Sequence, residues 1–169
     1  NRNYATPAVS RMMRELTADL SRRDPSARPR YLDAGFPFPG LPMLPHLSHG
    51  DGRKIDLAFF YEGGGLPSPI GYWAYASPAS GEAAPCRGQE GWLRWDLDVL
   101  QPLVAPVRLD ERRMRLLLDR LTEGAGRFGL EKILIEPHLA KRLGIHHPLI
   151  RFQGCAAARH DDHLHLQLR

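Results

Sequence analysis

Alternating apolar and polar residues predict that the chain ends in a β-strand. In HLHLQLR, residues 163–169, leucines alternate with His163, His165 and Gln167. A period of two places the leucines on one face of a strand and the polar side chains on the other. The side chains of His163 and His165 therefore leave the strand on the same side. Two imidazoles held side by side on a rigid strand suit a metal site.

A spacing of three or four residues between apolar positions predicts two amphipathic helices. The first follows Thr6, whose hydroxyl oxygen can cap it, has Pro7 at its first position and ends near residues 22–23. Its apolar positions are Val9, Met12, Met13, Leu16 and Leu20. The second has Asp110 as its N-cap and ends near Gly124. Its apolar positions are Met114, Leu117, Leu118 and Leu121.

Three apolar runs predict further strands. They are IDLAFFY at residues 55–61, IGYWAYA at residues 70–76 and LEKILIE at residues 130–136. The aromatic side chains of the second run are expected in the core or along a substrate groove. A short helix over PHLAKRL is predicted to begin at Pro137 and to end at Gly144.

Proline and glycine are frequent, at 15 and 16 residues, so long loops are expected around a modest amount of regular structure. The loop from Asp24 to Pro45 is too long to be a simple connection, and residues 78–106 are predicted to be irregular. Helices and strands mix without strict alternation. We therefore predict an α+β fold in which a small antiparallel sheet is flanked by helices and long loops. The length fits one domain over residues 1–169.

Charge and hydropathy narrow the classes of function. No run of 18 apolar residues occurs, so the sequence contains no predicted membrane-spanning helix. The net charge of +4 suits an anionic partner such as nucleic acid, an acidic membrane surface or a cell-wall polymer. Because the arginines are scattered and no aromatic residues interleave with them, nucleic-acid binding is not expected.

The cysteines bear on the cellular compartment. Cys86 and Cys155 are the only two and form no C-x-x-C pair. They could be buried free thiols of a cytosolic protein or a disulfide in an exported one, and the sequence alone leaves both open. The chain starts at Asn1 rather than at a methionine, which is compatible with a removed signal peptide or anchor.

A second group of metal-binding residue types lies in PHLSHGDGRKIDL, residues 45–57, which contains His46, His49 and Asp56. The glycines of this segment form a turn that can fold His49 back towards Asp56. One imidazole from the last strand would complete a set of two histidines and one carboxylate. Three protein ligands leave a fourth position for water, which is the arrangement of a catalytic zinc site.

The two clusters resemble the motifs of a known group of zinc peptidases. SHGDGRKID, residues 48–56, is similar to the S-H-x-x-G-x-x-x-D motif of the group that contains lysostaphin, D-Ala-D-Ala metallopeptidases and Sonic hedgehog. HDDHLHL, residues 160–166, resembles the closing H-x-H of that group. Both motifs occur in the order that the group shows.

Two further histidines sharpen this resemblance. His46 stands three residues before His49, and His160 stands three before His163. This spacing is most similar to that of the penicillin-insensitive murein endopeptidases. Residues 130–143 also resemble the strand and helix that precede the closing motif in that family, whereas the N-terminal helix and residues 62–106 match no part of it.

The resemblance implies a role for each matching residue. The positions that match zinc ligands are His49, Asp56 and His165. His163 matches a histidine that lines the site without binding metal, and it could accept the proton of the attacking water or stabilise the oxyanion. His160 could act as a second acid or orient a ligand, and His46 matches an accessory histidine.

Some positions differ from the family pattern or have no assigned role. Leu164 stands where the dipeptidase branch carries its glutamate base, which argues against a D-Ala-D-Ala dipeptidase. Lys54 would either bring a cation near the metal or point away from it. Glu136 is expected to be structural, and Asp161 and Asp162 are candidates for hydrogen bonds to a ligand imidazole. His138, His146 and His147 match no motif and are expected at the surface or in loop packing.

These residues favour a zinc-dependent endopeptidase that hydrolyses peptide cross-links of bacterial peptidoglycan in the periplasm or outside the cell. One alternative is a non-catalytic zinc-binding recognition module, as in the hedgehog branch. Another is a peptidase for a different peptide, with residues 62–106 reshaping the groove. The sequence does not define which amide bond is cleaved or the oligomeric state.

Overall fold

Helices and one sheet make up the described part of the chain, which confirms the predicted α+β class. The structure, a computed structural model, describes residues 2–38, 40–41, 43, 47–66, 72, 86, 88–89, 91, 94, 103 and 108–169. Its elements in chain order are α1 (Pro7–Arg23), η1 (Leu47–Asp51), β1 (Lys54–Ala58), α2 (Glu111–Glu123), α3 (Ala125–Phe128), β2 (Leu130–Leu134), α4 (Pro137–Arg142), β3 (Ile150–Arg151) and β4 (His163–Leu168).

The two long helices form where the apolar spacing predicts them. Both ends of α1 agree with the prediction, although Thr6 makes no side-chain capping hydrogen bond. The carboxylate of Asp110 accepts the backbone N–H of Arg113 at 3.0 Å and caps α2 as predicted. The buried residues of the two helices are Val9, Met12, Leu16, Leu20, Met114, Leu117, Leu118 and Leu121. Each fully buried leucine stabilises the fold by about 1.5–3 kcal/mol.

The sheet has the strand order β1-β4-β2-β3, so the C-terminal strand is internal. β1 pairs with β4 antiparallel, with Asp56 opposite His165 and Ala58 opposite His163. β2 pairs antiparallel with the other side of β4, as expected. β3 pairs parallel to β2, so the sheet is mixed and the prediction of an antiparallel sheet is wrong at this edge. The reason is the connection through α4, because a helical crossover brings the next strand back in the same direction.

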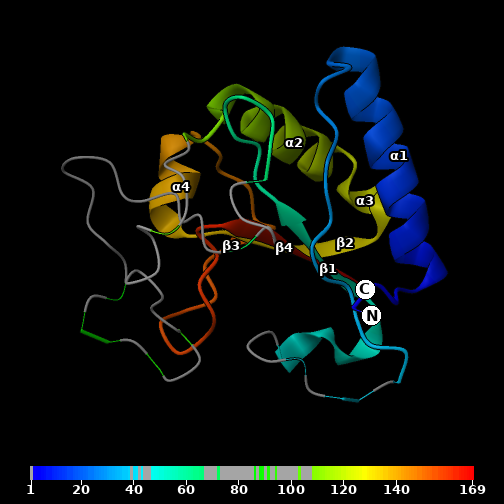
Figure 1. Cartoon of the computed structure of the whole chain (residues 1–169), viewed down its shortest axis with the longest axis vertical. Coiled ribbons are helices and arrows are strands. Elements are labelled where there is room, and N and C mark those ends of the chain that lie inside the picture. Colours follow the sequence, from blue (N-terminus) through cyan, green and yellow to red (C-terminus); the bar gives the residue numbers. More distant parts are fainter. Residues whose placement is uncertain are drawn as a thin grey trace.

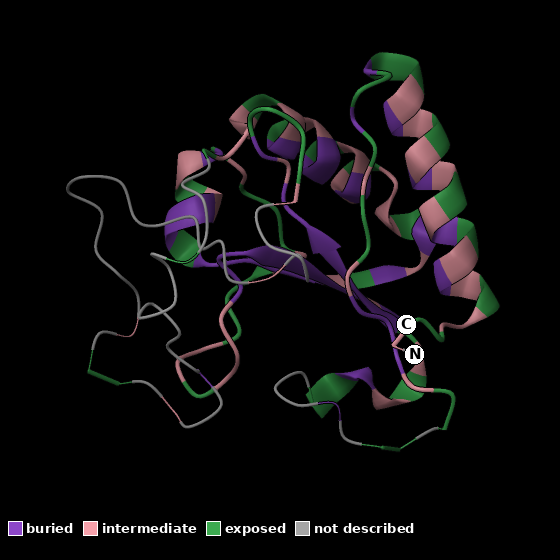
Figure 2. Cartoon of the chain, viewed as in Figure 1, coloured by how far each residue is buried: buried purple, intermediate pink, exposed green. Residues whose placement is uncertain are grey.

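The two faces of the sheet differ in chemistry, and both are buried. Helices α1 and α2 cover one face, whereas η1 lies on the opposite side (Figure 1). The leucines of β4 pack into the core on the helical side together with Ile55 and Leu57 of β1. Figure 2 shows that β1 and β4 are buried along nearly their whole length, whereas β2 and β3 are partly exposed. The polar side chains of the other face are therefore also shielded from water and need partners within the protein.

Several predicted boundaries change in the structure. β1 ends at Ala58, and Tyr61 makes only an isolated bridge to Leu109, so the strand predicted over residues 55–61 is too long. The elements η1, α3 and β3 were not predicted. The strand predicted over residues 70–76 lies outside the described residues except for Tyr72, as does most of the segment predicted to be irregular.

A disulfide joins Cys86 to Cys155, whose Cα atoms are 5.3 Å apart. The choice between free thiols and a bridge is thus resolved in favour of the bridge. Gly91 follows Cys86 closely and donates its N–H to the carbonyl of Cys155 at 2.8 Å. A Cβ atom on Gly91 would lie 2.6 Å from the Cα of Ala156, so only glycine allows the two segments to pack this closely. None of the helices in the described residues is long and apolar enough to cross a membrane.

Candidate metal centre

Three predicted ligands come together from three different elements. His49 lies in η1, Asp56 in β1 and His165 in β4, and each is at most 3% exposed. The antiparallel register places Asp56 directly opposite His165 on the polar face of the sheet. Gly52 adopts a left-handed conformation with a φ of 66°, which turns the chain from η1 into β1. His49 is thereby brought over the same face.

The ligand atoms of these residues are close enough to share one ion. Nδ1 of His165 lies 2.9 Å from Oδ1 of Asp56. Nε2 of His49 lies 3.1 Å from that nitrogen and 3.2 Å from that oxygen. Neighbouring ligands of a tetrahedral ion with bonds of about 2.0–2.1 Å are about 3.3 Å apart. The three atoms therefore already have nearly the separation that a tetrahedral metal ion requires.

Hydrogen bonds and burial favour the form of histidine that binds metals. The Nδ1–H of His49 donates to the carbonyl of Ala34 at 2.5 Å, so Nε2 presents its lone pair to the centre. Burial lowers the pKa of His165 although the carboxylate of Asp56 acts in the opposite direction. Neutral imidazoles next to a carboxylate form a donor set suited to a divalent cation.

His163 lies beside this centre and is held by a second carboxylate. Its Nδ1–H donates to Oδ1 of Asp162 at 2.5 Å, and its Nε2 lies 3.8 Å from Oδ2 of Asp56. Burial by itself would lower the pKa of His163, but the carboxylates of Asp162 and Asp56 outweigh it and raise the pKa to about 9. His163 therefore lies beside the three ligand residues, and its predicted role as a residue that does not bind metal stays a prediction.

His160 completes the histidine cluster from the loop that precedes β4. Its ring centroid lies 5.0 Å from that of His163 and 5.7 Å from that of His165. The backbone N–H of His160 donates to Oε1 of Glu136 at 3.2 Å, while the N–H of Glu136 donates to the carbonyl of His160 at 3.1 Å. Glu136 thus fixes the backbone of His160 at two points.

Glu136 is paired in turn with an arginine from the segment between the cysteines. The guanidinium of Arg94 donates to both oxygens of Glu136, at 3.1 Å and 2.8 Å, and both side chains are buried. The N–H of Arg94 donates to the carbonyl of Gly91, close to the disulfide. This arrangement agrees with the expected structural role of Glu136. The sequence contains no signal for Arg94, because its partner is 42 residues away.

Tyr72 is a second site residue that sequence reasoning did not assign to the centre. Its hydroxyl lies 2.9 Å from Oδ2 of Asp56 and 2.7 Å from Oδ2 of Asp33, and its ring packs edge-on against His163. Burial raises the pKa of this hydroxyl, as do the carboxylates of Asp56 and Asp33, so it stays protonated and donates a hydrogen bond. Arg2 lies 2.8 Å from Asp33 and balances its charge.

Other sequence-predicted residues lie elsewhere. Lys54 makes an ion pair with Asp51 at 2.6 Å, and Asp51 is not one of the three ligand residues. Asp161 accepts hydrogen bonds from Arg159, and Asp162 bonds to His163 rather than to a predicted ligand imidazole. The expectation that His138 lies at the surface or in loop packing is wrong, because this residue is buried in α4, whereas His146 and His147 are exposed as expected. His46 lies outside the described residues.

Comparisons with protein-family models, with curated proteins and with solved structures find no match to this chain. The resemblance to zinc peptidases therefore rests on the two motifs and on residues 130–143. The structure adds that His49 and Asp56 of the first motif and His165 of the second have ligand atoms within 4.8 Å of one another.

Proposed function

We propose that this chain is a zinc-dependent peptidase that hydrolyses peptide cross-links of bacterial peptidoglycan. The observation that carries the proposal is the convergence of Nε2 of His49, Oδ1 of Asp56 and Nδ1 of His165 within 3.2 Å of one another. Two histidines and one carboxylate leave a coordination position open, as catalytic zinc sites do. Further histidines beside the three ligands supply groups that can move protons.

The proposed roles follow from the contacts of each side chain. His49, Asp56 and His165 would hold the metal ion, which when bound would acidify a water molecule and polarise the scissile carbonyl. His163 would hold a proton for the leaving amine, since Asp162 fixes its Nδ1–H and directs Nε2 towards the centre. Tyr72 would orient Asp56 through its hydroxyl.

Net charge and the disulfide support the proposed substrate and location. A net charge of +4 suits an anionic wall polymer. The Cys86–Cys155 disulfide suits an oxidising compartment such as the periplasm or the extracellular space, where peptidoglycan is found. The proposed partner is a peptidoglycan peptide, not nucleic acid.

A non-catalytic zinc-binding module is the second candidate, and the burial of the centre favours it. The side chains of His49 and Asp56 have no solvent-exposed surface. A centre that a substrate does not reach suits a structural role rather than catalysis. The presence of His163 argues against a non-catalytic module, because such a module would not need this histidine.

Digestion of purified peptidoglycan tests the proposal. The protein would be used as isolated, after chelation and after zinc is restored, and the products would be analysed by mass spectrometry. We expect cross-linked fragments to disappear only when zinc is present. His163→Ala should retain zinc and lose hydrolysis about 100-fold or more. Zinc-loaded, folded protein that leaves the cross-links intact would favour the recognition module or another peptide substrate.

A further inference from the structure

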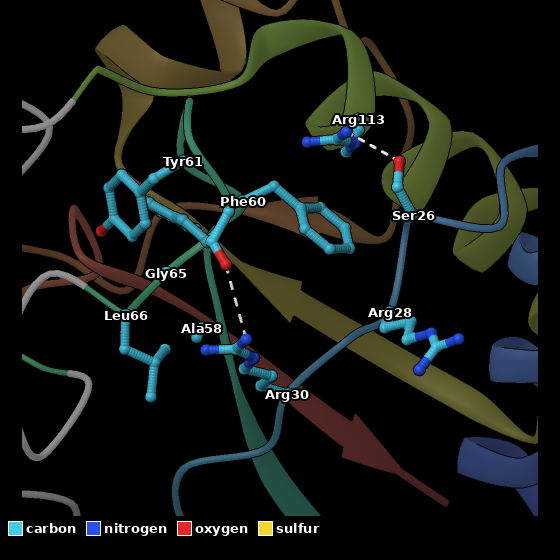
Figure 3. A pocket seen from close by; sticks show the side chains of 11 residues that line it. Ser26, Arg28, Arg30, Ala58, Phe60, Tyr61, Gly65, Leu66 and Arg113 are labelled. Carbon is cyan, nitrogen blue, oxygen red and sulfur yellow. Dashed lines mark hydrogen bonds between the residues drawn. The ribbon is translucent and has the colours of Figure 1, made fainter.

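A separate cavity of about 120 Å³ opens beside the end of β1 (Figure 3). Its walls come from the loop after α1, from the chain that follows β1 and from the first turn of α2. The lining residues are Ser26, Arg28, Arg30, Ala58, Phe59, Phe60, Tyr61, Gly64, Gly65, Leu66 and Arg113. Three of these side chains are cationic, and no acidic side chain is among them.

The positive charge of this cavity is only partly compensated. Arg113 donates to Asp110 at 2.8 Å and to Ser26 at 2.7 Å, so it belongs to a closed network at the start of α2. Among the described residues, Arg30 reaches only the carbonyl of Gly64, at the long distance of 3.5 Å. Arg28 forms no ion pair with any residue in the part of the chain that the structure describes. Both arginines are exposed, and no carboxylate of residues 2–38, 47–66 or 108–169 pairs with either of them.

Apolar side chains form the rest of the wall. In the view of Figure 3 the ring of Phe60 lies between Arg113 and the pair Arg28 and Arg30. Leu66 and Ala58 extend this surface. Such a site suits a ligand that carries an anionic group on a short apolar body, because planar guanidinium groups bind carboxylates through two parallel hydrogen bonds.

Strand β1 contributes a residue to both the cavity and the candidate metal centre. Ala58 follows the ligand Asp56 by two residues and lies directly opposite His163 in the sheet. Tyr61, another wall residue, directs its hydroxyl to the backbone carbonyl of Asp162 at 3.5 Å. A peptide that contacted both sites would run along the end of this strand.

We propose that the cavity binds a carboxylate of the peptide substrate through Arg28 and Arg30. This assignment rests on the proposed peptidase function and makes it more specific, since it defines a charged group that the substrate carries. A free C-terminal carboxylate or an acidic side chain would supply the same chemistry.

Calorimetry on the protein without added metal tests this assignment separately from hydrolysis. The probes are N-acetyl-trialanine with a free C-terminal carboxylate, its C-terminal amide and inorganic phosphate. We expect the acid to bind about tenfold or more tightly than the amide, and this preference to disappear in an Arg28→Ala/Arg30→Ala variant. Arg11→Ala is the matched control, because Arg11 is an exposed arginine on α1.

Each other outcome would overturn the assignment. Equal affinity for acid and amide, no binding of either peptide, or unchanged binding by the double variant would each exclude a carboxylate site at these arginines. Tighter binding of phosphate than of the peptide acid would identify a general anion site instead. Equal unfolding temperatures of the variants and the wild type would show that the changes act on binding. None of these measurements depends on hydrolysis. Failure of the carboxylate-site proposal can therefore be distinguished from failure of the peptidase proposal.

Discussion

The two sides of the histidine cluster are held in place in different ways. Asp56, His163 and His165 lie on paired strands, where backbone hydrogen bonds set their positions. His160 lies in the preceding loop, where the buried carboxylate of Glu136 and the guanidinium of Arg94 hold it. We refer to these as the strand side and the loop side of the cluster.

This difference predicts which changes each side tolerates. Backbone pairing in a sheet does not depend on any one side chain, so the strand side should keep its geometry after most single substitutions. The loop side depends on one buried ion pair, and removing one partner of such a pair leaves an uncompensated charge. The loop side should therefore be the more fragile half of the site.

The largest expected effect is on zinc affinity, and it should differ between a metal ligand and a neighbouring histidine. His165→Ala should weaken zinc binding more than about 100-fold, whereas His160→Ala should weaken it less than about tenfold. Zinc affinity measured by competition with a chromophoric chelator tests both. Similar losses in the two variants would mean that the loop side supplies a ligand.

Breaking the ion pair should have the next largest effect. Arg94→Met leaves the carboxylate of Glu136 buried without its partner, and we expect the free energy of unfolding to fall by about 3–5 kcal/mol. Urea unfolding followed by circular dichroism measures the change. The exposed Arg11→Ala serves as a control and should stay within about 0.5 kcal/mol of the wild type. A loss below 1 kcal/mol for Arg94→Met, on the order of a surface pair, would refute the fragility of the loop side.

Removing the disulfide should destabilise the protein by a comparable amount. Because Cys86 and Cys155 are 69 residues apart, loop entropy predicts a loss of about 4 kcal/mol for the Cys86→Ser/Cys155→Ser variant, at the upper end of the typical range of about 2–4 kcal/mol. Zinc affinity should change less than about threefold, since the ligands lie on other elements. A large drop in zinc affinity in the folded variant would show that the segments joined by the disulfide also help to hold the metal ligands in position.

The smallest expected effect concerns the strand side. Lys54 pairs with Asp51, which is half exposed, so Lys54→Met should change stability by about 1 kcal/mol or less. Zinc affinity should remain at the wild-type value, because the charge of the ammonium group is already balanced by the carboxylate of Asp51. A marked increase in affinity would indicate that Lys54 repels the metal ion, contrary to its observed contact.

Local patterns were sufficient to predict much of the fold. The period of two in residues 163–168 predicted β4 and the common face of His163 and His165. Helical spacing and the cap at Asp110 predicted α2 with its boundaries. Glycine and histidine spacing indicated which residues could meet at a metal. Each of these patterns depends only on residues a few positions apart, so it can be recognised in the sequence without knowledge of the tertiary structure.

Tertiary structure alone decided how these pieces meet. His49 and Asp56 approach His165 across 116 and 109 residues of chain, and no local pattern contains such a distance. The same reason applies to Tyr72 beside Asp56, to Arg94 beside Glu136 and to the choice between thiols and a disulfide. The chain by itself determined which side chains share a face of a strand or helix. Packing determined which faces meet, because contacts between distant segments depend on the whole core and not on any one segment.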